Sequence, residues 1–296
     1  MMLPSKENKL YLGYKINNKT RLTPNHYLIG FRKFGMKFRA ILPGFQHCGK
    51  YFTIKCPYLK ASRNYSCTFS LSNTILPHLK NLFESFKLNK AYSTPYADIY
   101  NFHKDEIELN IKCLRFVSKF MCEMTFDSPT NYFGISGLYG PGISLTGQDS
   151  GTAVGIALGT GSLLFLDWAS YLIRKIISIK SNGKYLMFGN EDFTIYDFPN
   201  VRLQLFVSYK TKEEVVGLEI FEMLQELCNM YNLDWFSMKL RISAEGTERW
   251  TQEFYRRNIN VENTCKIYIT TPPLQEFEVK QYLINIGISK QLIIIL

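Results

Sequence analysis

Two apolar segments, each ending in a tight turn before a helical pattern, constrain this fold most. Residues 153–158 read Ala-Val-Gly-Ile-Ala-Leu and stop at a Gly-Thr-Gly turn, 159–161. Far downstream, the mainly apolar run 266–270 stops just before a Pro-Pro pair, 272–273. Ligands of open α/β sheets lie beyond the carboxyl ends of such strands, where glycines let a phosphate approach the backbone. The two turns together predict a nucleotide-binding domain in the second half of the chain.

The second half alternates between strand-like and helical spacing. Strand-like runs fall at 153–158, 201–209, 236–242, 265–270 and 291–296. Helical patterns fall between them, at 162–180, 213–231, about 247–258 and 274–286. Because this alternation is typical of parallel strands with crossover helices, we expect a five-stranded parallel sheet. Polar, Gly-rich residues place the start of this domain near 147, and residues about 181–200 are interpreted as an insertion.

The first half has the short alternating runs that are typical of an antiparallel β-barrel, separated by turn residues such as Pro24 and Pro57. These runs are 27–31, 49–55, 62–72, 106–112 and 131–136. A short helix is expected at about 118–124, and residues about 73–103 are interpreted as an insertion that contains a helix. We therefore expect an N-terminal β-barrel domain, 1–146, and a C-terminal α/β domain, 147–296.

The charge balance is basic, with 35 lysine and arginine residues against 25 acidic ones and a formal net charge of +10. No run of five or more like charges occurs. A solvated basic surface and a surface that docks an acidic partner both explain this balance. The chain has no basic stripe or nucleic-acid-binding motif, so nucleic acid is not an expected partner.

The cysteines and histidines indicate neither a disulfide framework nor a metal site. Seven cysteines occur without Cys-x-x-Cys spacing, and the four histidines are scattered. Free thiols are typical of a reducing compartment, and residues 1–19 show no secretory or transit signal. We expect an intracellular protein, either cytoplasmic or mitochondrial. No transmembrane segment is expected, because Asp167 and the early glycines of 156–173 favour a strand, turn and helix.

Short motifs follow one another along the chain in a specific order. They are residues 49–54, Arg63-x-Tyr65-Ser66, Ile111-Lys112, Val117-Ser118, Gly140-Pro141, the Gly-Thr-Gly turn and Pro272-Pro273. This order resembles the flavin-binding barrel and nucleotide domain of the ferredoxin-reductase superfamily, over about residues 10–296. Among its members, the layout is most similar to cytochrome-b5 reductase and related flavin reductases. The resemblance implies FAD, together with NADH or NADPH, as cofactors.

The resemblance also implies roles for individual side chains at the flavin. Arg63 would make a forked contact with the pyrophosphate, and Tyr65 would lie against the isoalloxazine ring. Ser66 would bond at the reactive edge of that ring, and Ser118 would open a helix whose free amides hold the pyrophosphate. The residues expected to bind FAD are Arg63, Tyr65, Ser66, Lys112, Val117 and Ser118.

The Gly-Thr-Gly turn lies where the superfamily brings the nicotinamide against the flavin. Thr160 and Ser66 are the residues that the resemblance places at the reacting rings. The residues expected to bind the dinucleotide are Gly159, Thr160, Gly161, Thr270, Thr271 and Pro272. Ser208 and Lys210 are expected at its adenosine end. Lys210 either pairs with a ribose phosphate or is solvated, so the choice between NADH and NADPH stays open.

The sequence departs from the superfamily pattern beside the nicotinamide. Thr270-Thr271 replaces the usual Cys-Gly, and Thr271 adds bulk where the dinucleotide approaches. One expectation is a flavoenzyme that passes electrons from NAD(P)H through FAD to an acidic haem or iron–sulfur acceptor protein. The other is a non-catalytic relative that keeps the fold as a structural subunit of a larger complex, such as a respiratory one. The departures and the two insertions motivate the second.

Overall fold

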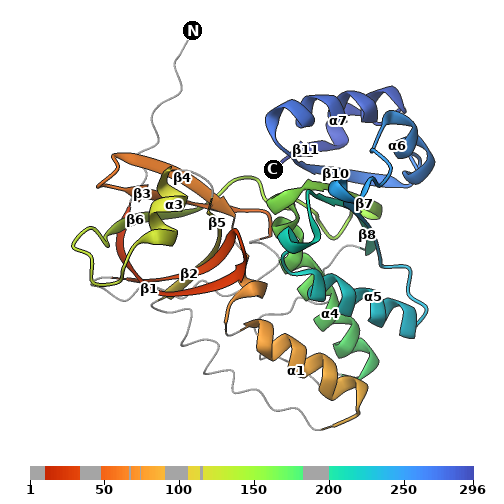
Figure 1. The fold of residues 1–296 in the computed structure, drawn as a ribbon. Helices are drawn as coiled ribbons and strands as arrows, with labels where there is room; N and C mark the ends of the chain where they lie inside the picture. The colour runs from red at the N-terminus through yellow and green to blue at the C-terminus, as the bar shows by residue number, and fades with distance from the viewer. Residues whose placement is uncertain are drawn as a thin grey trace.

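The first half of the chain folds into one antiparallel sheet of six strands. The computed structural model describes residues 11–33, 48–66, 68–73, 75–90, 106–113, 116–182 and 200–296. The strand order is β4-β3-β6-β1-β2-β5. The strands are β1 (Leu12–Thr23), β2 (His26–Lys33), β3 (Tyr51–Cys56), β4 (Ala61–Ser66), β5 (Glu106–Lys112) and β6 (Phe133–Tyr139). The sheet curls until its edge strands β4 and β5 are in contact, which gives the barrel lobe of Figure 1.

Alternating side chains fill the inside of the barrel lobe. Successive residues of a strand point to opposite faces, so every second apolar residue can be buried. Phe31 of β2 and Phe133 of β6 meet edge to face with ring centroids 5.8 Å apart. The short helix α3 (Phe116–Glu123) adds Val117 and Met121 to the same core. Helix α3 therefore covers one side of the barrel beside β4.

The second half folds into a five-stranded sheet of order β11-β10-β7-β8-β9, with every neighbouring pair parallel. Its strands are β7 (Ser150–Leu158), β8 (Asn200–Tyr209), β9 (Phe236–Ile242), β10 (Thr264–Thr270) and β11 (Ile293–Ile295). Strand β7, the first to form this sheet in the sequence, lies between β10 and β8. The Gly-Thr-Gly turn that follows β7 is therefore in the middle of the sheet edge.

Two layers of helices cover the faces of the parallel sheet (Figure 1). Helices α4 (Leu166–Lys180) and α5 (Leu218–Met230) pack on one face through residues such as Trp168 and Leu224. Helices α6 (Gln252–Asn258) and α7 (Pro273–Asn285) pack on the other through residues such as Phe254 and Leu283. The predicted fold class, an antiparallel β-barrel followed by a five-stranded parallel α/β sheet, is confirmed.

Three helices of the second lobe start several residues later than the sequence predicts. The helix expected from 162 starts as a 3₁₀ helix, η3 (Gly159–Phe165), and becomes α4 only at Leu166. The helix expected at 213–231 starts at Leu218, because Gly217 adopts a left-handed conformation with φ of 73° after the short η6 (Lys212–Glu214). Helix α6 starts at Gln252, where the Thr251 hydroxyl accepts the Phe254 amide and caps the helix.

The strand expected at 62–72 is shorter than predicted. Strand β4 ends at Ser66, and the chain then forms a 3₁₀ helix, η2 (Phe69–Leu71). The amides of Phe69 and Ser70 donate to the carboxylate of Asp167 in the other lobe instead of to a neighbouring strand. The chain thus leaves the sheet after Ser66 to meet Asp167, which is almost one hundred residues away in the sequence.

The predicted insertion at 73–103 contains helix α1 (Ile75–Lys87), which packs against α4 of the other lobe (Figure 1). Residues 74 and 91–103 of this insertion and residues 183–199 of the second one lie outside the described residues. The two shortest remaining elements of the second lobe are η7 (Ser243–Glu245) and η8 (Lys290–Leu292).

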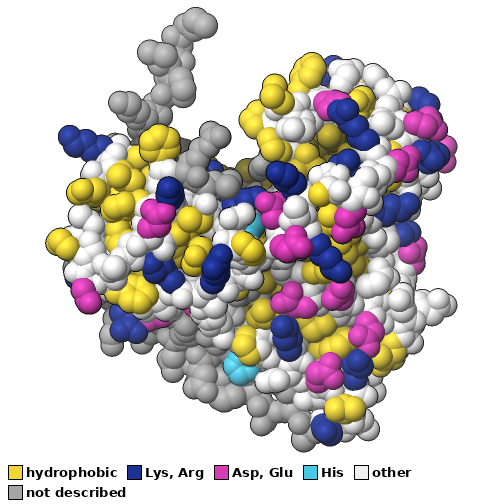
Figure 2. Space-filling model, in the orientation of Figure 1, with side chains coloured by type: hydrophobic (Ala, Val, Ile, Leu, Met, Phe, Trp, Pro, Cys, Tyr) yellow, Lys and Arg dark blue, Asp and Glu magenta, His cyan; other side chains and the backbone are white. Residues whose placement is uncertain are grey.

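On the face seen in Figure 2, acidic and basic side chains are mixed over the parallel-sheet lobe. The positive net charge is therefore not concentrated on this side of that lobe. Within the described part of the chain, every helix is too short or too polar to cross a lipid bilayer.

Candidate functional site

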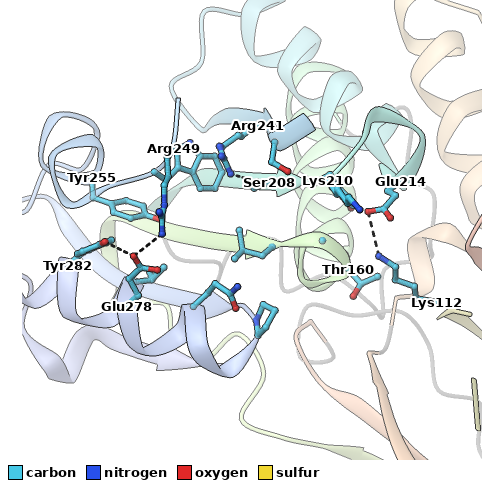
Figure 3. Close-up of a pocket in the computed structure, with 18 residues that line it drawn as sticks. Lys112, Thr160, Ser208, Lys210, Glu214, Arg241, Arg249, Tyr255, Glu278 and Tyr282 are labelled. Carbon is cyan, nitrogen blue, oxygen red and sulfur yellow. Dashed lines mark hydrogen bonds and ion pairs between the residues drawn. The ribbon is translucent and has the colours of Figure 1, made fainter. Parts of the chain in front are cut away.

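A cavity of about 530 Å³ opens at the carboxyl ends of β7, β8 and β9. It is lined by Leu158 to Thr160 at the end of β7, by Ser208 to Lys210 at the end of β8, and by Arg241 of β9. Helix α7 forms the facing wall (Figure 3). Such crevices at the carboxyl edge of a parallel sheet are where ligands of open α/β folds bind. The cavity is thus in the position that the sequence predicted for a dinucleotide.

The Gly-Thr-Gly turn is held in one geometry by its two glycines. Gly159 has a φ of +58°, in the left-handed region that favours glycine, and no atom lies near the place of its absent Cβ. A Cβ on Gly161 would instead collide with the carbonyl oxygen of Thr270 at the end of β10. Gly161 therefore serves the close approach of two strands, and Thr160 is the side chain of the turn that lines the cavity.

A pair of hydroxyl groups ties this turn to the neighbouring strand. The Ser162 hydroxyl lies 2.5 Å from the Tyr209 hydroxyl and 3.2 Å from the Gly159 carbonyl oxygen. Ser162 is buried, and Tyr209 is a buried residue that lines the cavity. Burial raises the pKa of Tyr209 above its ordinary value, so the phenol stays protonated and can donate.

Four cationic side chains and two carboxylates line the cavity. At one end, the Lys112 ammonium from the barrel lobe lies 3.6 Å from the Glu214 carboxylate, beside Thr160 (Figure 3). At the other end, Arg249 and the Tyr282 hydroxyl share one oxygen of Glu278, at 3.2 and 2.6 Å.

Two cations of this cavity, Arg241 and Lys210, have no carboxylate partner among the described residues. Arg241 donates to the Ser208 hydroxyl at 3.3 Å and to the Glu248 carbonyl oxygen at 2.9 Å. Lys210 is exposed on the cavity rim, next to Ser208 in sequence. Unpaired cations around a serine hydroxyl suit an anionic group such as a phosphate.

The three residues predicted at the end of β10, Thr270, Thr271 and Pro272, differ in burial and in whether they line the cavity. Thr270 is buried, and its hydroxyl points back to the Ile156 carbonyl oxygen at 3.4 Å, into the sheet. Thr271 is half-buried, and its hydroxyl lies 3.5 Å from the Pro272 carbonyl oxygen. Pro272 lines the cavity. Of these three residues, Pro272 is the one in the cavity wall, and Thr270 supports the turn from behind.

The predicted flavin residues Arg63, Tyr65 and Ser118 come together beneath α3. An Arg63 guanidinium nitrogen lies 3.4 Å from the Ser118 hydroxyl, although the two residues are 55 positions apart. The Tyr65 hydroxyl also faces Ser118, and burial raises the pKa of Tyr65 to about 12. Arg63 is exposed and has no carboxylate partner within the described residues. Val117, next to them, is buried in the barrel core.

Ser66 is half-buried at the end of β4, where the chain crosses toward the Gly-Thr-Gly turn. Two residues later, the Thr68 hydroxyl lies 3.4 Å from the Leu163 carbonyl oxygen of η3, directly after that turn. The end of β4 and the turn after β7 are therefore neighbours across the two lobes. That Ser66 and Thr160 both lie at the reacting rings stays a prediction.

The pyrophosphate end of a flavin dinucleotide fits these residues better than its ring does. An unpaired guanidinium beside a helix start is the donor set that a pyrophosphate needs. Tyr65, however, is buried, with only 7% of the residue exposed, so little of its ring is open to a ligand in this structure. A planar ring that stacks on Tyr65 would have to displace the groups that cover it.

Sequence reasoning did not select Arg241, Arg249 or Tyr209 as site residues. Arg241 is the last residue but one of the predicted strand 236–242. The carboxyl-end rule that selected Ser208 would have found it. Arg249 lies in a segment that the sequence assigned to a helix, and no sequence signal places it at the cavity.

Solved structures of similar fold include a flavohemoglobin, a cytochrome b5 reductase domain and a ferredoxin-NADP+ reductase. The flavohemoglobin from Malassezia yamatoensis, with bound FAD and haem, is 14% identical with a TM-score of 0.62, over 98% of this chain and 60% of its own. The cytochrome b5 reductase domain of Ulva prolifera nitrate reductase is 12% identical with a TM-score of 0.59, over 97% of each chain. A variant of the ferredoxin-NADP+ reductase from Plasmodium falciparum, in complex with 2′P-AMP, is 16% identical with a TM-score of 0.57, over 97% and 95%.

These likenesses show the fold, at identities too low to carry an activity. This chain spans 60% of the length of the flavohemoglobin, so it corresponds to part of that protein. No protein-family model matches the sequence, and no curated protein matches it.

Proposed function

Because this chain has the ferredoxin-reductase-like fold, we propose that it is an FAD-dependent oxidoreductase. It would take electrons from NADH or NADPH and pass them singly to an acceptor protein. The observation that carries the proposal is the meeting of Arg63 and Ser118, 3.4 Å apart. The Arg63 guanidinium is exposed at the start of a helix and has no carboxylate partner among the described residues, so it is available to an anion. The pyrophosphate of FAD would supply that anion.

The cavity in the other lobe supports a dinucleotide as the second ligand. It lies at the carboxyl edge of the parallel sheet, as such ligands require, and Thr160 lines it on the side of the barrel lobe. Arg241 and Lys210, which have no carboxylate partner in the part of the chain that the structure describes, lie beside Ser208. Because a ribose phosphate adds about two negative charges at this end, these residues favour NADPH over NADH.

FAD, when bound, would supply the redox chemistry by accepting a hydride and releasing electrons one at a time. The residues of this chain would bind and orient the two cofactors. Arg63 and Ser118 would hold the flavin pyrophosphate, while the turn at Thr160 would fix the approach of the nicotinamide. No side chain is required as an acid, base or nucleophile. Positioning alone is therefore the task that we assign to the protein.

One observation favours a second function, a flavin-free structural subunit of a larger complex. Tyr65 is buried, with 7% of the residue exposed. A tyrosine that stacks on a flavin needs an open face. If the groups that cover Tyr65 do not yield to a flavin, the barrel keeps its fold without a cofactor.

Purified protein separates the two functions. The protein is freed of loose ligands by gel filtration, incubated with FAD, and filtered again, and flavin absorbance is then measured per chain. The flavoenzyme retains about one FAD per chain, and its absorbance bleaches on anaerobic addition of NADPH or NADH. Retained flavin that neither nucleotide bleaches would refute the electron transfer but not the binding. Folded protein that retains no FAD supports the structural subunit.

A further inference from the structure

The segment that leaves β4 crosses from the barrel lobe to the parallel-sheet lobe. The carboxylate of Asp167, in the first turn of α4, accepts the amides of Phe69 and Ser70 at 3.0 and 2.7 Å. It also accepts the Ser70 hydroxyl at 2.6 Å. Asp167 is buried, and burial raises the pKa of its carboxyl, against which these three donors act. A buried acid of one lobe thus receives three hydrogen bonds from the segment that leaves the other, in addition to the favourable charge of Arg174 on its own helix.

The far end of the same segment is anchored to the barrel. The buried carboxylate of Glu108, on β5, accepts both the amide and the side-chain nitrogen of Asn73, each at 2.7 Å. Residues 68–73 are therefore held between two buried carboxylates, one from each lobe. Because burying an unpaired carboxylate is costly, the donors of this segment stabilise both Asp167 and Glu108 in the folded protein.

Helix α1 extends this contact along the outside of the second lobe (Figure 1). Lys80 and Lys87 pair with Glu219 and Glu226 of α5, at 3.5 and 2.6 Å. Exposed ion pairs of this kind contribute little free energy, roughly 0–1 kcal/mol each. Their spacing of seven residues on both helices instead sets how the two helices lie side by side.

Apolar packing supplies the larger part of the contact. Leu71, Leu79 and Leu82 are buried in one hydrophobic cluster that also contains Leu166, Trp168 and Leu224 of the second lobe. A Cβ on Gly217, at the start of α5, would meet both Leu71 and Leu166. The two lobes therefore share a core, and residues 68–73 together with helix α1 carry the connection.

We infer that residues 68–73 and helix α1 form an interlobe clamp that makes the two lobes unfold as one cooperative unit. Separating the lobes would leave Asp167 without its donors and would expose the leucines of the shared core. Both consequences disfavour an opened or half-unfolded state. The inference assigns a task to the first insertion, and it holds whether or not the protein binds a flavin.

Tryptophan fluorescence can test the clamp, because all three tryptophans, Trp168, Trp235 and Trp250, lie in the second lobe. Ile54 is fully buried in the barrel core, so Ile54→Val weakens the barrel. In urea, this variant should lower the midpoint detected by tryptophan fluorescence. The loss of unfolding free energy calculated from that curve should equal the loss measured by hydrogen exchange at the β2 amides. An unchanged tryptophan midpoint would overturn the inference.

Ile54→Val is then repeated with the clamp weakened. Asp167→Asn replaces the acceptor, and Ser70→Ala, which keeps both amides, serves if that variant does not fold. In either background the shift of the tryptophan midpoint should shrink to less than about half. In the matched control Thr264→Val, which deletes an equally short hydroxyl bond within the second lobe, the full shift should persist.

A full shift in the Asp167→Asn or Ser70→Ala background would show that the coupling lies elsewhere, against the inference. The measurement needs neither FAD nor a dinucleotide, so it is independent of the proposed function.

Discussion

The hydroxyl of Tyr209, at the end of β8, lies 2.5 Å from the hydroxyl of Ser162, directly after the Gly-Thr-Gly turn. Ser162 in turn is 3.2 Å from the carbonyl oxygen of Gly159. The end of one strand thus fixes the turn after its neighbour. Since Thr160 lines the cavity from that turn, the hydroxyl pair governs where Thr160 lies.

Tyr209→Phe should weaken dinucleotide binding without unfolding the protein. The change removes one buried hydrogen bond, worth about 1 kcal/mol, and frees the turn. We expect the Kd for NADPH to rise roughly three- to tenfold, measured by calorimetry. Tyr255→Phe is the matched control, because Tyr255 also lines the cavity but lies away from the turn. Equal effects of the two substitutions would remove the special role of the Ser162 contact.

Arg63→Ala should release FAD. The loss of a charge-assisted contact, about 1.5–3 kcal/mol, predicts a Kd for FAD at least about tenfold higher. Arg63→Lys keeps the charge but loses the planar fork, so an intermediate Kd is expected. Flavin per chain after gel filtration is the measurement. Arg21→Ala, which removes another exposed arginine of the barrel lobe, should retain flavin like the unmodified protein.

Arg241→Ala should affect NADPH more than NADH. Arg241 lies beside Ser208 without a carboxylate partner among the described residues, so it is free to pair with a ribose phosphate. We expect roughly tenfold weaker binding of NADPH and less than about threefold for NADH, with the difference shrinking at high salt. Arg202→Ala, which removes an arginine paired with Asp234 near the opposite end of β8, is the control. Equal losses for both nucleotides would exclude a phosphate-binding role for Arg241.

His26 should make the barrel lobe sensitive to acid. His26 is fully buried, and burial, with a smaller effect of Lys112, lowers its pKa to about 4 from an ordinary 6.5. The folded state therefore favours neutral histidine. The contribution of neutral His26 to the free energy of unfolding is complete above pH 6.5. It is lost as the pH falls toward 4, by up to about 3 kcal/mol.

His26→Asn removes this titration and can still face the Thr23 hydroxyl, 2.9 Å from the His26 ring. Urea midpoints of the two proteins, measured at several pH values between 7.5 and 4.5, should converge as the pH falls. Asp167 and Glu108, whose pKa values are raised by burial, act in the opposite direction in both proteins and cancel in the comparison. Parallel midpoint curves would contradict the assignment to His26.

Local patterns in the sequence were enough to predict the parallel sheet. The run at 153–158 is apolar, the run at 236–242 alternates apolar and polar residues, and the bounds of β7 and β9 agree with them within three residues. Helix α7 starts at Pro273, where a proline pair marks a helix start. These signals lie within a few residues of the element that they predict.

Features that depend on distant partners could not be predicted in this way. The end of β4 at Ser66 depends on Asp167, and the place of α1 depends on α4 and α5. The meeting of Arg63 with Ser118 was implied by the resemblance but not by spacing. The cover over Tyr65 has no signal in the sequence at all.

The contacts of Asp167 also limit which truncated versions of this protein can fold. A truncated version that starts near residue 147 would lose the two amides and the hydroxyl that donate to this buried acid. A version that ends there would present Leu71, Leu79 and Leu82 to water. Recombinant halves should therefore aggregate or be degraded, and only a version that retains both sides of this joint is suited to crystallisation or labelling.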